Sequence, residues 1–305
     1  MNEIREELNR RIDEKFKAIE QNPEVHLEGL IWAQPITYWD YILPDALLNL
    51  QVQRTTQPDE MVFIMYHQIN ELLFKMILWE IRQVSENDQV DAAFFTEKLT
   101  RISRYFDMLS SSFSIMGDGM EKEQYMKFRN TLTPASGFQS AQYRHIEFAS
   151  TDWINLVDRR FRENFERDAQ AEKVYEHLYW QAAGKDHSTG KKNTLITLFE
   201  ARYKNAFLDK IKYYEGRNLW ARFRQLPAEV KNKPELVKAM RHYDKTVNIT
   251  WVMAHYHAAA KYLGTAEATG GSDWRKYMLP QYQRRIFFPD LWTSEEHENW
   301  GKDQI

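Results

Sequence analysis

The sequence of 305 residues contains no cysteine. Disulfide bonds, cysteine nucleophiles, zinc–cysteine sites, iron–sulfur clusters and thiolate-ligated haem are therefore excluded. Glycine and proline are also few, with 11 and 9 residues, and strand-like alternation is scarce, which favours long helices. No apolar run reaches the length of about 18 residues that a membrane span needs, so we expect no membrane association of that kind.

An excess of positive charge is missing as well. The 41 basic and 44 acidic residues leave a net charge of −3, which gives no reason to expect a nucleic-acid partner or an anionic membrane surface. The N-terminal stretch MNEIREELNRRIDEKF is charged and lacks the apolar core of a signal peptide. We therefore expect a cytoplasmic protein.

The sequence has the composition of a globular protein and is rich in aromatic residues. Hydrophobic residues make up 43% and charged residues 28%, as in soluble folded proteins. Aromatic residues reach 14%, including 10 tryptophans. Most of these rings should fill a large core, and a minority could line a pocket for a flat ligand. Composition does not choose between these roles.

Apolar residues recur every three or four positions along most of the chain, which predicts an all-α fold. We expect one helical domain over residues 1–305, with residues 1–30 as a peripheral N-terminal helix. A short helix should begin at Pro44, since proline suits a first helical turn. Longer helices are expected at about 59–84, 91–114, 138–181 with a break near Ser150, 194–214 and 234–263, and another short helix at 121–130.

A histidine lies inside the most apolar of these predicted helices. His67 follows Phe63 by four residues, so both side chains share one face. A satisfied core histidine is the commoner explanation for such a residue. A polar group in an apolar ligand pocket is the alternative.

A tyrosine and an arginine share a face of the short helix at 121–130. Tyr125 and Arg129 are four residues apart, and an arginine fork can bind a planar carboxylate with two hydrogen bonds. A surface arginine beside a tyrosine is the more frequent arrangement. The loop that follows contains Ser136, which offers a hydroxyl and backbone donors.

Two histidines near the end of the last long helix differ in their surroundings. His255 shares its face with Trp251 and small alanines, which leave room for a flat porphyrin. His257 lies about 200° further round the helix, so the two imidazoles cannot bind one metal ion from a regular helix. A structural histidine among small packing residues is nearly as good an explanation.

Four stretches of the chain together resemble the tryptophan 2,3-dioxygenase family over roughly residues 30–292. They are YWDYILPDALLNLQ (38–51), DEMVFIMYHQINELLFK (59–75), FRNTLTPASGFQSAQYRHIEF (128–148) and TGGS (269–272). The resemblance implies a helical fold with a haem pocket between long helices. It also implies haem b, with ferrous iron in the active state, and a reaction in which dioxygen cleaves the indole C2–C3 bond of L-tryptophan to give N-formylkynurenine, a step of tryptophan catabolism.

The resemblance also implies a role for individual residues. His255 matches the axial ligand of the haem iron, and His67 the distal histidine that binds the indole N–H. Phe63 matches the ring that packs on the indole, and Ser136 a serine on the distal side of the haem.

Other matching residues concern the amino-acid part of the substrate and the assembly. Arg129, with Tyr125, matches the pair that holds the carboxylate, and Thr269 the residue that contacts the ammonium and carboxylate groups. The family also implies a homotetramer in which a neighbouring subunit closes the pocket. The matching residues for that role are Tyr38, Tyr41 and Ile42.

The chain departs from the family pattern in the loop around Thr269. Ala268 stands where the family usually has glycine, and Asp273 and Trp274 follow Ser272. Asp273 brings a negative charge near a site for a carboxylate, so a substituted tryptophan is a possible substrate. Two further alternatives are a haem-dependent monooxygenase of an aromatic amino acid and a non-catalytic haem-binding or sensor protein.

Overall fold

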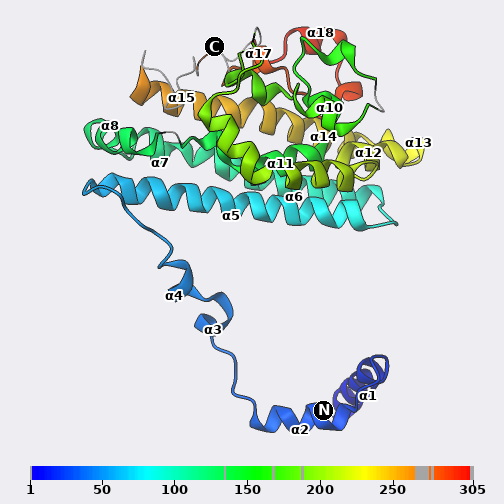
Figure 1. Cartoon of the computed structure of the whole chain (residues 1–305). Coiled ribbons are helices and arrows are strands. Elements are labelled where there is room, and N and C mark those ends of the chain that lie inside the picture. Colours follow the sequence, from blue (N-terminus) through cyan, green and yellow to red (C-terminus); the bar gives the residue numbers. More distant parts are fainter. Residues whose placement is uncertain are drawn as a thin grey trace. The chain divides into compact units, whose positions relative to one another are not determined.

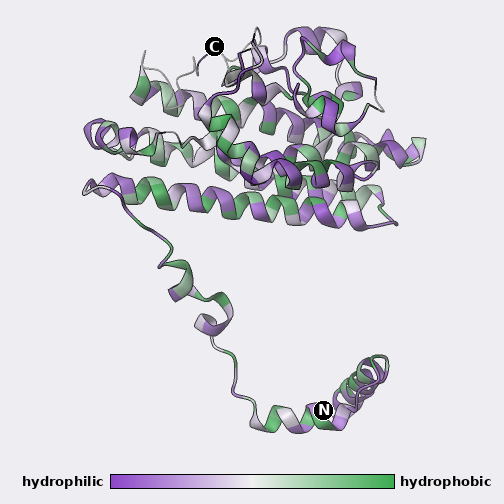
Figure 2. Ribbon diagram, in the orientation of Figure 1, coloured by the Kyte–Doolittle hydropathy of each residue, from purple (hydrophilic) through white to green (hydrophobic). Residues whose placement is uncertain are grey.

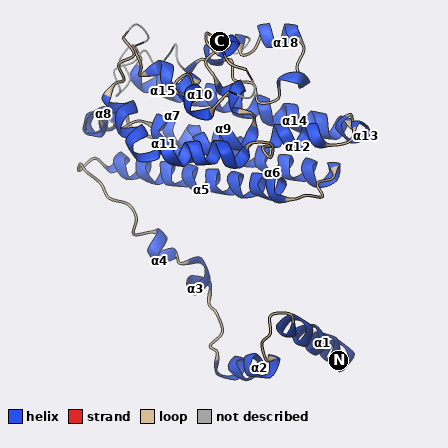
Figure 3. Ribbon diagram, turned by 45° about the vertical axis from the view of Figure 1, so that its right-hand side comes forward, coloured by secondary structure: helices blue, strands red, loops and turns tan. Residues whose placement is uncertain are grey.

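The structure is a computed structural model that describes residues 2–133, 135–166, 169–186, 189–264, 275 and 278–302. Its regular elements in these ranges are all helices (Figure 3), beside two isolated β-bridges, Val157–Leu178 and Lys185–Lys192. The prediction of an all-α fold is confirmed. None of the described helices combines the length and apolarity required to cross a lipid bilayer.

The chain divides into two compact units, Met1–Gln51 and Val52–Ile305. The first unit contains α1 (Asn2–Lys17), α2 (Pro23–Trp32), α3 (Tyr38–Ile42) and α4 (Pro44–Leu47). Side-chain caps begin two of these helices: Asn22 caps α2, and Thr37 forms a capping box with Asp40 at α3. The described residues of these four helices bury only Pro23, so caps and backbone bonds define this unit more than a core does.

The second unit contains the remaining helices (Figure 1). They are α5 (Pro58–Glu86), α6 (Ala92–Ser111), α7 (Phe113–Gly117), α8 (Lys122–Arg129), α9 (Ala141–Ser150), α10 (Ala171–Tyr175), α11 (Thr194–Tyr214), α12 (Leu219–Gln225), α13 (Ala228–Lys231), α14 (Pro234–Lys245), α15 (Trp251–Leu263), α17 (Pro280–Gln283) and α18 (Ser294–Glu298). Helix α5 forms one side of this unit, and α6 and α9 pack on it. Helix α14 packs on α6, and α11 packs on α9.

Helix α6 shows how the periodic sequence builds this core. Its inward side chains are separated by four and three residues in turn, and each is fully buried: Phe95, Leu99, Ile102, Phe106 and Leu109. Burying a side chain of this size stabilises a fold by about 1.5–3 kcal/mol. Asp91 caps the helix by accepting a 2.8 Å hydrogen bond from the Phe94 N–H. The spacing and the cap together set where this helix begins and which face it buries.

The longest helix, α5, is apolar on two faces. Apolar and polar residues alternate along its length (Figure 2). One face packs into the core through Leu73, Phe74, Ile77, Ile81 and Val84. The opposite face leaves five large apolar side chains exposed at spacings of four and three residues, and we call these the outward stripe: Met65, Ile69, Leu72, Met76 and Trp79.

Helices α14 and α15 form one continuous helix with a π-helical turn between them, at Thr246–Thr250. The wider turn shifts the register, so the faces of α15 are not those that the spacing of α14 predicts. Such π turns often lie next to functional sites. Here the turn ends five residues before His255.

The helix predicted between Ser150 and residue 181 is mostly wrong. The helical elements described between residues 153 and 183 are 3₁₀ turns, among them η3 (Trp153–Leu156) and η5 (Tyr179–Ala183), and the short α10. Thr151 has an extended backbone, and its hydroxyl donates a 2.5 Å hydrogen bond to the Phe287 carbonyl. Tertiary contacts of this kind override local helix propensity.

Candidate active site

Phe63 and His67 lie together on the inner part of α5. Their ring centroids are 4.1 Å apart, and His67 Nδ1 lies 2.7 Å from the Phe63 carbonyl oxygen. A carbonyl oxygen only accepts, so Nδ1 carries the proton and Nε2 of the neutral ring is an acceptor. Burial lowers the pKa of His67, although the Phe63 carbonyl and the charge of Glu71 act in the opposite direction. His67 is therefore a neutral imidazole near pH 7.

Tyr125 and Arg129 come from α8, which is tied to the start of α5. The Glu121 N–H donates to the Asp59 carboxylate over 2.6 Å, and the Asp59 N–H donates to Gln124 over 3.1 Å. Arg129 is buried. Burial raises the pKa of Tyr125, whereas the charge of Arg129 and a hydrogen bond from it lower that pKa. The arginine and the tyrosine thus form a buried polar pair.

The α5 and α8 residues meet in a group of aromatic side chains that we call the site cluster. The Tyr125 ring lies 6.3 Å from Phe63 and 4.9 Å from Tyr262 of α15, centroid to centroid. The buried members of the cluster are Tyr66, Phe113, Met116, Met120 and Tyr262, and half-buried members include Val62, Phe63, Tyr125, Trp251, Ala254 and Ala258. Segments from three parts of the sequence therefore share one apolar environment.

His255 enters this environment from α15. Burial, together with the smaller effect of the nearby His67, lowers the pKa of His255 to about 4, so the two imidazoles influence each other across the site. The Phe113 ring stacks beside His255, with centroids 5.2 Å apart and planes 11° from parallel. His257 is exposed on another face of α15. The structure thus separates the two histidines as the helical geometry predicts.

Residues of the stretch SGFQSAQYR (136–144) contact both α5 and α15 and so connect these two helices. The sequence did not reveal this role. The Gln142 amide donates to the carbonyl and the carboxylate of Glu71 on α5, over 2.8 and 2.7 Å. The Tyr143 ring stacks on Trp251 of α15 at 4.7 Å. Contacts between such distant residues leave no periodic signal in the sequence.

A fully buried charge cluster lies behind this contact. Glu147 is paired with Arg144 over 2.8 Å and also with Arg285 from the C-terminal part of the chain. Arg285 also donates to the Tyr143 hydroxyl over 2.8 Å. Removing Glu147 would leave two buried guanidinium groups without a counter-charge, and an uncompensated buried charge typically destabilises a protein by about 3–5 kcal/mol. This cluster therefore holds Tyr143 against α15.

The remaining predicted site residues lie elsewhere. Ser136 caps the 3₁₀ turn η2 (Gly137–Gln139), where its hydroxyl accepts from the Phe138 N–H over 3.4 Å. Thr269 and its neighbours Ala268, Asp273 and Trp274 lie outside the described residues. The three residues expected at a subunit boundary belong to the first unit and are exposed: Tyr38, Tyr41 and Ile42.

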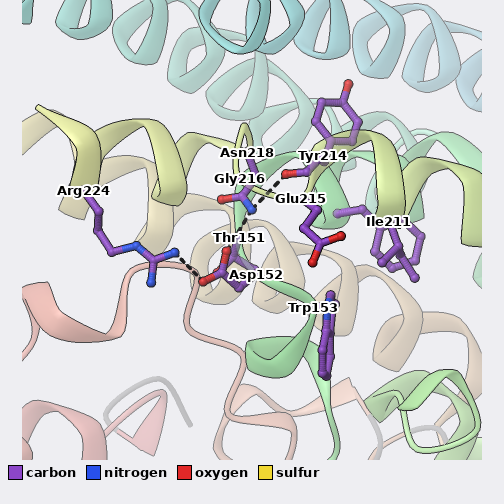
Figure 4. A pocket seen from close by; sticks show the side chains of 10 residues that line it. Thr151, Asp152, Trp153, Ile211, Tyr214, Glu215, Gly216, Asn218 and Arg224 are labelled. Carbon is purple, nitrogen blue, oxygen red and sulfur yellow. Dashed lines mark hydrogen bonds and ion pairs between the residues drawn. The ribbon is translucent and has the colours of Figure 1, made fainter. Parts of the chain in front are cut away.

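A separate cavity of about 250 Å³ lies between Trp153 and the end of α11 (Figure 4). One of its two acidic residues, Asp152, is already paired with Arg224 at 2.6 Å and accepts a 2.9 Å hydrogen bond from Asn218. None of the predicted site residues lines it. We therefore assign the candidate active site to the site cluster and not to this cavity.

The donor groups at the site cluster fit haem better than a bare metal ion. The described residues contain no cluster of three or more histidine and carboxylate side chains suited to a metal. Haem iron needs only one protein ligand, because the porphyrin supplies four nitrogens. A neutral imidazole is the ligating form of histidine, and His255 is neutral and lies beside the rings of Phe113 and Trp251.

Comparison with known proteins gives one consistent result. The family model described as tryptophan 2,3-dioxygenase matches residues 30–246, a range that ends before His255. Tryptophan 2,3-dioxygenase of Bacillus thuringiensis subsp. konkukian is 28% identical over 292 residues, which cover 90% of this chain and 98% of the relative. The protein of that name from Pseudomonas fluorescens is 26% identical over 275 residues, with 88% and 93% covered. The chain therefore belongs to the tryptophan 2,3-dioxygenase family.

Proposed function

We propose that this protein is a haem-dependent dioxygenase that cleaves the indole C2–C3 bond of L-tryptophan with dioxygen to give N-formylkynurenine. One observation carries the proposal beyond family membership. A neutral acceptor, an aromatic ring and a buried arginine–tyrosine pair share one apolar cluster with His255. This set is complementary to an aromatic amino acid with one ring N–H.

Each part of the substrate has a partner in this proposal. The indole packs on Phe63, and its N–H donates to Nε2 of His67, which the Phe63 carbonyl leaves as an acceptor. The carboxylate binds the guanidinium of Arg129, because a buried carboxylate needs an opposite charge. Tyr125 orients that arginine, and Thr269 contacts the ammonium and carboxylate groups.

His255 is the proposed axial ligand of haem b, and Ser136 is proposed to lie on the distal side. Haem, when bound, supplies the activation of dioxygen. The residues of the chain bind and orient the indole and exclude water from it. Neutral His67 accepts a hydrogen bond here, and the proposal assigns no strong base to the site.

The assembly is part of the same proposal. We propose that Tyr38, Tyr41 and Ile42 reach the pocket of a neighbouring subunit in a homotetramer. Large apolar side chains of the first unit are exposed, among them Trp32 and Trp39, and so is the outward stripe of α5. Extended apolar surface of this kind marks protein–protein interfaces, where aromatic residues are enriched.

The mass of the product tests the reaction. Reduced, haem-loaded protein is mixed with L-tryptophan and air, and the product is analysed by mass spectrometry. The proposal expects a gain of two oxygen atoms. A gain of one would identify a monooxygenase, and a protein that binds haem but leaves tryptophan unchanged would identify a haem-binding or sensor protein.

A further inference from the structure

The ring of Phe113 lies parallel to the imidazole of His255, although the two residues come from different helices. Their centroids are 5.2 Å apart and their planes differ by 11°. Within the described part of the chain, the His255 imidazole makes no hydrogen bond. The second side-chain torsion of histidine has broad minima. The plane of this ring is therefore set by its packing neighbours.

The structure holds Phe113 firmly in this place. It is 9% exposed, and the Tyr66 ring packs against it with centroids 5.9 Å apart. Helix α7, which contains Phe113, packs on α15. The Tyr262 hydroxyl, two helical turns after His255, lies 2.9 Å from the Met120 carbonyl oxygen and also contacts that of Met116. Phe113 is thereby held between Tyr66 of α5 and a segment that Tyr262 ties to α15.

Trp251, the other ring close to His255, is placed differently. Its plane is tilted by 41° from the imidazole, with centroids 6.1 Å apart. It stacks instead on Tyr143 at 4.7 Å and 30°. Phe113 is thus the parallel neighbour of the imidazole, and Trp251 belongs to the core behind it.

We propose that Phe113 is a positioning residue that fixes the plane of the His255 imidazole as a ligand of the haem iron. The inference rests on the proposed function, because it needs His255 as the axial ligand. A metal-bound histidine usually donates its second N–H to an acceptor that orients the ring. Here a stacked phenyl ring performs this orienting role.

The test is the iron–histidine stretching band in the resonance Raman spectrum of the reduced, haem-loaded protein. In Phe113→Leu, which removes the flat ring, we expect this band to shift or broaden and haem to dissociate roughly tenfold faster, as for other residues that orient metal ligands. Phe113→Tyr keeps the ring and should restore the band. Phe148→Leu, at a buried position of the main core, is the matched control and should leave the band unchanged.

Further variants separate a failure of this inference from a failure of the proposed function. If the band survives in His255→Ala, another histidine binds the haem iron, and the assignment of His255 as the axial ligand in the proposed function is wrong. If His255→Ala abolishes the band but Phe113→Leu has the band and haem dissociation rate of the parent, the ligand is right and the role of Phe113 is overturned. If Phe113→Leu does not fold by circular dichroism, Phe113→Met, which nearly keeps the volume, replaces it in the comparison.

Discussion

Arg129 is the residue on which substrate selection depends most directly. It is buried beside Tyr125, and a hydrogen bond to a charged group contributes about 1.5–3 kcal/mol, or one to two decades in affinity. We expect Arg129→Ala to lower kcat/KM for L-tryptophan about 10- to 100-fold. Arg129→Lys should rescue only part of this loss, because lysine offers a point charge instead of a planar fork.

Tryptamine provides the control for the role of Arg129. It keeps the indole and the amine but lacks the carboxylate, so the parent protein should turn it over very poorly. Arg129→Ala should narrow the difference in kcat/KM between L-tryptophan and tryptamine. Comparable turnover of both by the parent protein would show that the carboxylate is not recognised, and the substrate would then not be an amino acid.

The two histidines of α15 offer a second comparison at this scale. Only His255 faces the site cluster, whereas His257 is exposed. We expect His255→Ala to lose haem or to bind it with an altered Soret band, and His257→Ala to keep the parent spectrum. The opposite pattern in absorbance titrations would move the ligand to His257.

At the scale of elements, one carboxylate joins α14 to the C-terminal segment. Asp244 is fully buried and accepts hydrogen bonds from the Phe287 N–H at 2.9 Å, the Phe288 N–H at 3.0 Å, the Trp292 indole at 3.0 Å and the Asn248 amide at 2.7 Å. Asp244→Ala leaves these donors buried without an acceptor. We expect it to reduce the free energy of unfolding by about 3 kcal/mol or more.

Urea denaturation measures this effect. The control is Asp209→Ala on α11, at an exposed position, where a change within about 0.5 kcal/mol is expected. Equal midpoints for the two variants would mean that Asp244 does not anchor the segment.

Helices α10 and α11 are connected by an ion-pair network that should respond to pH. Burial alone would raise the pKa of Glu176, but hydrogen bonds from Lys192 and Lys204 outweigh it and lower the pKa to about 2. The folded-state pKa is thus below the ordinary value of 4.5. The stabilisation is therefore present above about pH 4.5 and is lost as the pH falls towards 2.

The variant Glu176→Gln tests this linkage. After allowance for solvent screening, we expect it to reduce the free energy of unfolding at pH 7 by about 1–2 kcal/mol. The difference from the parent should shrink when denaturation is repeated at lower pH. A difference that is constant from pH 7 to pH 3 would assign the loss to packing instead of charge.

At the scale of the whole molecule, the exposed first unit allows a test by subunit complementation. Tyr41→Ala impairs the segment given to a neighbour, and His67→Ala impairs the receiving pocket. Each variant alone should have little activity. Mixed and reassembled, they should recover about a quarter of the parent activity, because a random mixture joins an intact segment to an intact pocket in about that fraction of sites.

Two results would contradict this arrangement. One is a mixture no more active than the average of its components. The other is a fully active monomer in light scattering at the assay concentration.

Local periodicity determined much of this protein in advance. Helix α11 begins and ends at the predicted residues, Thr194 and Tyr214, and α5 within one or two residues of its predicted ends. The i and i+4 spacing also placed Phe63 beside His67, and Tyr125 beside Arg129. These features follow from the sequence because a helix that buries one face repeats its apolar residues every three or four positions, and neighbours on a face are close in sequence.

Only the tertiary structure decided the rest. The π turn at Thr246–Thr250, the non-helical backbone after Ser150 and the ring of Phe113 beside His255 have no periodic signal. Arg285 donates a hydrogen bond to Tyr143, which lies 142 positions earlier in the sequence. Such contacts depend on how separate helices pack, and the free energy of that packing overrides local propensity, so they are set by the fold as a whole.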